Sequence, residues 1–238
     1  MRNTFIIAAK ELKSYLTSPM AYVIIAVFLI GTGFFFGNSQ ATYYETSISG
    51  FLASPYYIII LLLLITVLTM RLLAEEKKLG TIELLLTAPV RDSEIIIGKF
   101  LGSLGIIVIM LILTLYYPIL LVIFGDPDFG PIAAGYLGLF LLCCSALAIG
   151  IFASSLTSNQ IVAAVVGGAI LLGLWFLGTM TTFLPQNIGN VIGYISLSNY
   201  FPSFILGVID TRGIIYYLSV TGLFLFLAVR TLENSRWS

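Results

Sequence analysis

The chain has 238 residues, of which 59% are hydrophobic and 9% are charged. A charged fraction that far below the roughly 25% of soluble domains excludes an ordinary soluble protein. The 11 basic and 11 acidic residues cancel, which leaves no general basic surface for nucleic acid, and the absence of histidine removes Ser-His-Asp hydrolysis and most zinc or haem ligand sets.

The first segment, residues 1–18, is not a signal peptide, because charged residues interrupt its apolar stretch: Lys10, Glu11 and Lys13. Phe5, Ala9, Leu12 and Leu16 recur at helical spacing, so we expect an amphipathic helix lying in the membrane interface. Ser18 followed by Pro19 is typical of a new helix start, with serine as the N-cap.

Apolar runs of spanning length follow. A span needs about 20 apolar residues, so the chain has room for about six to eight. The hydropathy pattern predicts six transmembrane helices near residues 20–37, 51–73, 95–124, 132–156, 161–184 and 214–231. The fold class expected is an all-α polytopic membrane protein, with residues 1–238 forming a single transmembrane domain.

The loop between the second and third spans, residues 71–99, holds ten of the 22 charged residues. Gly80 breaks the chain there, Thr81 can cap a new helix, and Glu83 favours the positive N-terminal end of a helix dipole. Pro89 follows the run 82–88, so we expect a short cytoplasmic helix over 81–88 whose exposed leucines need a partner. The third span is then expected to be capped by Asp92 or Ser93.

The segment 185–213, before the last span, is too polar and too often broken by proline and glycine to cross a membrane. It is also too apolar for a free loop, since it carries several aromatic and aliphatic side chains. We expect a re-entrant hairpin of short helices, with a surface loop as the alternative.

Lys and Arg indicate the orientation. With six spans, ten of the eleven basic residues fall on one side, in the N-terminal segment, the loop 71–99 and the C-terminal tail, and Arg212 falls on the other. By the positive-inside rule both termini are expected in the cytoplasm.

The loop pattern resembles that of the permeases of the ABC-2 family of ABC transporters. The residues that carry the resemblance are Glu75, Glu76, Gly80, Thr81, Glu83, Leu84, Leu85, Leu86 and Pro89. The whole chain follows the family layout, and the ending LGVIDTRGIIYYLSVTGLFLFLAVRTLE is most similar to the permeases associated with gliding motility and with nitrous-oxide-reductase maturation.

The resemblance implies a mechanism and partners. The loop helix would be a coupling helix that docks into a separate ABC ATPase subunit, which would bind ATP and Mg; this chain has no GxxxxGK[ST] motif and is expected to hold no cofactor, metal or catalytic residue of its own. Two permeases, identical or paralogous, would form a C2 dimer in a bacterial inner membrane, in contact with its lipid, and export a lipid-like, polysaccharide or hydrophobic substrate.

Three other functions stay open. The chain could transmit force to a protein partner at the outer face without moving cargo, it could be a membrane enzyme with Asp210 as acid or base, or it could be a passive scaffold. Within the loop, the leucines could pack on the spans instead of a partner, and the run Glu75 to Lys78 could be a solvated helix end.

Overall fold

The computed structural model describes the chain except for residues 1, 44–48, 53, 82–89, 126 and 235–238. Its described part contains six helical stretches long and apolar enough to cross a membrane: Pro19–Asn38, Pro55–Leu79, Asp92–Ile123, Phe129–Ser155, Gln160–Met180 and Thr211–Asn234. The six predicted spans are therefore confirmed, with ends within a few residues of those expected except where the second and third stretches extend into the loop 71–99.

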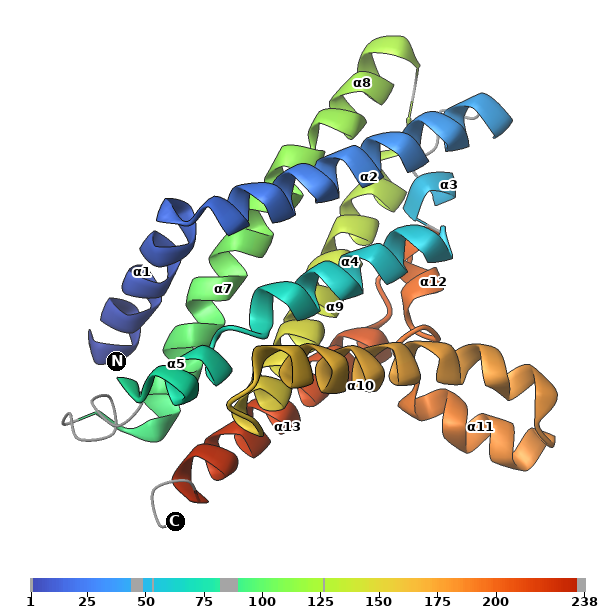
Figure 1. The fold of residues 1–238 in the computed structure, drawn as a ribbon. Coiled ribbons are helices and arrows are strands. Elements are labelled where there is room, and N and C mark those ends of the chain that lie inside the picture. The colour runs from blue at the N-terminus through green and yellow to red at the C-terminus, as the bar shows by residue number, and fades with distance from the viewer. Residues whose placement is uncertain (1, 44–48, 53, 82–89, 126, 235–238) are drawn as a thin grey trace.

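The helices follow one another with short connections (Figure 1). In chain order they are α1 (Arg2–Thr17), α2 (Pro19–Tyr43), α3 (Ser49–Leu52), α4 (Pro55–Thr69), α5 (Ala74–Leu79), α7 (Asp92–Thr114), α8 (Tyr116–Phe124), α9 (Phe129–Ser155), α10 (Gln160–Met180), the 3₁₀ helix η1 (Thr181–Phe183), α11 (Gln186–Ile195), α12 (Phe201–Ile205) and α13 (Thr211–Asn234). The start of α1, helix α5 and the end of α13 lie at one end of the bundle (Figure 1).

Helix α9 is the centre of the bundle, with 83% of its most apolar window buried, and it packs against α4, α7, α10, α12 and α13. Its sequence is rich in Ala, Gly and Ser, which allow other helices to approach closely. At Gly150, an added Cβ would lie 2.1 Å from Oγ1 of Thr69 on α4. The α4–α9 contact therefore depends on the lack of a side chain there.

Helix α1 packs along the first half of α7 and runs in the same direction. Added Cβ atoms at Gly98, Gly102 and Gly105 would lie 2.8, 2.6 and 2.9 Å from side-chain atoms of Ile7, Glu11 and Leu12. Because 32 residues at about 1.5 Å each exceed a hydrocarbon core of about 30 Å, α7 and α8 together are long enough for the first part of α7 to stand outside it.

Helix α1 packs on α7 with a face that shares only Leu12 with its predicted apolar stripe. Of the four residues expected on that stripe, Leu12 packs against α7, whereas Phe5, Ala9 and Leu16 are exposed. The glycine-lined groove of α7 and a charge on its floor select a different face, which includes Ile7, Ala8 and Glu11. The placement of α1 in the membrane interface stays a prediction.

The N-cap at Ser18 is confirmed, since its Oγ accepts a hydrogen bond from the Met20 N–H at 3.4 Å. The cap expected for the third span is wrong, because α7 begins at Asp92 and the carboxylate of Glu94 accepts from the Arg91 N–H at 3.2 Å. Glu94 takes the third helical position, from which a glutamate reaches back to the cap residue.

The third span bends between α7 and α8. Pro118 has no N–H to donate to the carbonyl of Thr114, which would be its acceptor in a continuous helix. The hydroxyl of Tyr136, on α9, donates to that carbonyl at 2.8 Å instead. The freed acceptor is thereby satisfied by a neighbouring span.

After α10 the chain turns back through η1 and α11, which extend to one side of the bundle in Figure 1, before α12 returns to pack on α9. Short helices in this segment were expected, and they are present. Whether they dip into a bilayer, as a re-entrant hairpin would, stays a prediction.

Candidate functional site

Helix α5 opens the charged loop and is fixed to the spans at its first residues. The N–H groups of Leu73 and Ala74 donate to Oγ of the buried Ser154 at 3.1 and 3.0 Å, and this hydroxyl donates to the Met70 carbonyl at 3.1 Å. One serine of α9 thus satisfies three backbone groups at the turn between α4 and α5.

A buried lysine forms a second attachment. Lys99, on α7, is only 2% exposed, and its ammonium lies 2.8 Å from Oε1 of Glu76 and 3.4 Å from Oε2 of Glu11. The two carboxylates are about four-fifths buried and come from α5 and α1. A buried charge with two hydrogen-bonded partners of opposite sign ties α1, α5 and α7 together.

Two further basic side chains belong to this end of the bundle. Lys77 donates from Nζ to the carbonyl of Ser155 at the end of α9. Arg71 pairs with Glu75 one turn later, at 2.7 Å, with both side chains about one-third exposed. Helix α5 is therefore bonded to α9 and α7 and, through Lys99, to α1.

Tyr15 adds a link from α1 to α4. Its hydroxyl donates to the carbonyl of Leu68 at 2.9 Å, and burial raises its pKa, so the phenol stays protonated as a donor. Beside it lies a cavity of about 240 Å³, between α1, α5 and α7. Its lining is mainly polar and charged: Lys10, Glu11, Ser14, Tyr15, Ser18, Arg71, Leu72, Glu75, Glu76, Leu79 and Lys99.

The structure describes four of the site residues that the sequence predicts. Glu75 and Glu76 lie on α5 and make the ion pairs above, and Gly80 ends α5 with φ +71°, a conformation that favours glycine, as the predicted chain break requires. The hydroxyl of Thr81 donates back to the Glu76 carbonyl at 3.4 Å. The others lie outside the described residues: Glu83, Leu84, Leu85, Leu86 and Pro89.

Sequence reasoning missed the residues that hold α5 in place. The sequence analysis assigns no role to Lys99, Glu11 or Ser154. A lysine about two helical turns after the start of an apolar span is nevertheless a sign that the charge has a buried partner. The run Glu75 to Lys78 is more than a solvated helix end, since two of its side chains bond to other helices.

Asp210, the residue of the enzyme hypothesis, lies at the start of α13. Its Oδ1 accepts a hydrogen bond from the Arg212 N–H at 2.9 Å. This is the geometry of a helix N-cap, a structural use of the carboxylate.

The comparison with known families identifies the chain. The family model of the ABC-2 family transporter protein matches residues 36–230, which cover the end of α2, α3 to α12 and most of α13. No curated protein matches the chain. Members of this family generally work with an ABC ATPase subunit, and the permease itself is the transmembrane part. The chain therefore belongs to the ABC-2 transporter family, as an integral membrane permease.

Proposed function

We propose that this permease forms a C2 dimer and couples ATP hydrolysis by a separate ATPase subunit to the export of a lipid-like, polysaccharide or hydrophobic substrate. The ATPase binds ATP and Mg, and the loop 71–99 is the docking element, with its short helix over 81–88 as the coupling helix. Both termini and this loop face the cytoplasm of a bacterial inner membrane. Within the family, the C-terminal sequence favours the gliding-motility and nitrous-oxide-reductase-maturation subgroup.

The observation that carries the proposal is the attachment of α5. Ser154, Lys77 and Glu76 connect this helix to α9 and α7, and Lys99 extends the connection to α1. A force applied to the residues that follow α5 would therefore act on several spans together, because a buried ion pair and buried hydrogen bonds resist separation. A loop joined to the rest only through its two ends would not transmit a displacement in this way.

The charge distribution supports the orientation. Lys77 and Lys78 belong to α5, which lies at the same end of the bundle as the start of α1 and the end of α13 (Figure 1). Arg71 and Lys99 pair with two glutamates of the same helix. That agrees with a cytoplasmic position for this end by the positive-inside rule.

The test is a detergent pull-down of the tagged chain from its native membrane, with labelling of nucleotide-binding subunits by azido-ATP and mass spectrometry. Three forms are compared: wild type, Leu85→Asp, and Leu156→Asp as a matched control. Leu156 is an exposed leucine that follows α9 at the same end of the bundle, outside the loop 71–99.

We expect the wild type and Leu156→Asp to recover an ABC ATPase and Leu85→Asp to lose it. The carboxylate of Leu85→Asp would be desolvated in the apolar groove of the ATPase. The absence of any ATPase from the wild-type sample would contradict the proposed function. Equal recovery with Leu85→Asp would contradict docking through this loop.

A further inference from the structure

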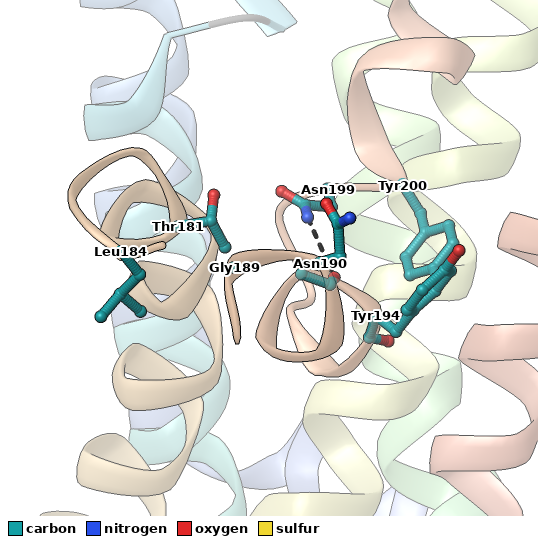
Figure 2. Close-up of a pocket in the computed structure, with 8 residues that line it drawn as sticks. Thr181, Leu184, Gly189, Asn190, Tyr194, Asn199 and Tyr200 are labelled. Atoms are coloured by element: carbon teal, nitrogen blue, oxygen red, sulfur yellow. Dashed lines mark hydrogen bonds between the residues drawn. The ribbon is translucent and has the colours of Figure 1, made fainter. Parts of the chain in front are cut away.

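A second hollow lies at the other end of the bundle. Helix α10 begins next to α5 and ends at Met180, so η1 and α11 belong to the end opposite the charged loop. Between η1, α11 and the turn before α12 there is a cavity of about 660 Å³, within the range of roughly 300–1,000 Å³ of small-molecule sites (Figure 2). Its lining residues are Thr181, Leu184, Gly189, Asn190, Gly193, Tyr194, Asn199 and Tyr200.

Tight packing gives this cavity a defined wall. An added Cβ at Gly193 would lie 2.8 Å from Nδ2 of Asn199, and one at Gly189 would lie 3.1 Å from the carbonyl of Thr181. The amide of Asn199 donates to the Gly193 carbonyl at 2.9 Å, the dashed bond in Figure 2. Helix α11 is thus fixed to the turn that follows it, and the wall does not depend on long flexible side chains.

Two tyrosines form an aromatic side of the cavity. Tyr200 stacks on Tyr216 with ring centroids 4.4 Å apart and an angle of 22° between the rings, and its hydroxyl donates to the carbonyl of Tyr194. The hydroxyl of Tyr216 donates to the carbonyl of Ile195. Tyr194 itself is 71% exposed. The fixed ring of Tyr200 beside the exposed ring of Tyr194 offers flat apolar surface together with polar edges.

The hydrogen-bonding groups of the cavity are uncharged. The side chain of Asn190 is exposed and forms no hydrogen bond within the described part of the chain, so its two donors and its acceptor are available to a ligand. None of the eight lining residues has a side chain that is charged at neutral pH, and the charges of Arg212 and Asp210, which act on Tyr200 from outside the lining, oppose each other. A phosphate or an ammonium group would find no opposite charge in this lining.

From this combination we propose that the cavity binds an uncharged glycosyl group. A sugar ring has an apolar face of C–H groups for the tyrosines and a rim of hydroxyls for the Asn190 amide. A site with an amide that has no partner in the described part of the chain favours ligands that supply hydrogen bonds to it. That the bound ring is the headgroup of an exported molecule rests on the proposed function, whereas the binding itself does not.

The experiment uses the full chain in lipid nanodiscs and saturation-transfer difference NMR. The probes are the methyl glycosides of glucose, galactose, mannose and N-acetylglucosamine, with glucose 1-phosphate as a charged control and triethylene glycol as a flexible, ring-free control. Variants are Asn190→Leu and Tyr194→Ala, both at exposed side chains, and Asn187→Leu, an exposed asparagine of α11 outside the lining, as matched control.

We expect at least one methyl glycoside to bind the wild type and Asn187→Leu, and to bind Asn190→Leu and Tyr194→Ala about tenfold more weakly. The two control compounds should bind at least tenfold more weakly than that glycoside. The proposal is overturned if no glycoside binds the wild type, if both lining variants bind glycoside like the wild type, or if either control compound binds as tightly as the glycoside.

The same preparations separate this proposal from the proposed function. ATPase recovery in the pull-down should be unchanged by Asn190→Leu, because Asn190 is at the far end from the loop 71–99. Glycoside binding without recovery of an ATPase would support the site and contradict the transport role. Recovery of an ATPase without glycoside binding would contradict the site alone.

Discussion

Replacing Lys99 by methionine tests the attachment of α5 most directly. The change removes a 2% exposed ammonium and leaves Glu76 and Glu11, each about four-fifths buried, facing one another without a counter-charge. At an effective dielectric constant of about 20, the 2.8 and 3.4 Å pairs correspond to about 6 and about 5 kcal/mol of attraction, most of which offsets the desolvation of the three charges. Breaking such an arrangement from one side costs about 3–5 kcal/mol.

The assay is reversible unfolding of the purified chain in mixed micelles, in a cycle with Glu11→Gln and Glu76→Gln. Lys99→Met should lower the free energy of unfolding by about 3–5 kcal/mol, and the triple variant should recover to within about 1 kcal/mol of the wild type, because no unpaired charge remains. The matched control is Arg230→Met, which breaks the exposed pair with Glu233 and should cost at most about 1 kcal/mol. A loss below 1 kcal/mol for Lys99→Met, or no recovery in the triple variant, would refute the reasoning.

Three other predictions follow from the packing. Ser154→Ala leaves the N–H groups of Leu73 and Ala74 without their acceptor, so it should lower the free energy of unfolding by about 1–3 kcal/mol and speed tryptic cleavage at Lys77 and Lys78. The control is Ser145→Ala, which should leave cleavage unchanged, because the Ser145 hydroxyl donates to the Leu142 carbonyl of its own helix. Gly102→Val should separate α1 from α7 and lower the free energy of unfolding in the micelle assay by about 1–3 kcal/mol. An added Cβ at Gly37 would meet no atom within 4 Å, so the control Gly37→Ala should leave that free energy unchanged. Equal stability of the two variants would contradict the α1–α7 contact. Tyr136→Phe should lower the free energy of unfolding by about 1 kcal/mol. The loss should be smaller in a Pro118→Ala background, because residue 118 then donates its own N–H to the Thr114 carbonyl. An equal loss in both backgrounds would show that the Tyr136 hydroxyl does not replace the donor that Pro118 lacks.

The number and ends of the spans could be predicted from the sequence because crossing a bilayer imposes a length and a composition that a single chain displays openly. The same holds for the break at Gly80 and the cap at Ser18, which depend on residues next to them in the chain.

The site itself could be predicted only in part. The charged loop was visible, but the partners of Glu76 and Lys77 lie on other helices, and 23 residues separate Glu76 from Lys99. Pairings of that kind depend on how helices pack, which no local pattern determines. Gly98 and Gly102 have the four-residue spacing of small residues that allows helices to pack closely, but that spacing does not identify the partner, which in the structure is α1.

The face by which α1 packs on α7 could not be predicted for the same reason. Apolar spacing indicates the side of a helix that avoids water, which includes Phe5 and Leu16, whereas the contact with α7 uses Glu11, which points to Lys99. The two sides of α1 make different contacts, because a buried charge such as Lys99 needs a partner of opposite sign on the helix that covers it.

The contact between Glu11 and Lys99 spans 88 positions of the chain, which has a consequence for biosynthesis. Helix α1 is translated before α7, and the two spans that contain α2 and α4 lie between them in the chain. Until Lys99 has been made, Glu11 lacks its partner on α7, so α1 cannot complete its packing before that helix is present. The assembly of the N-terminal helix is therefore a late step in the maturation of a segment that is made early.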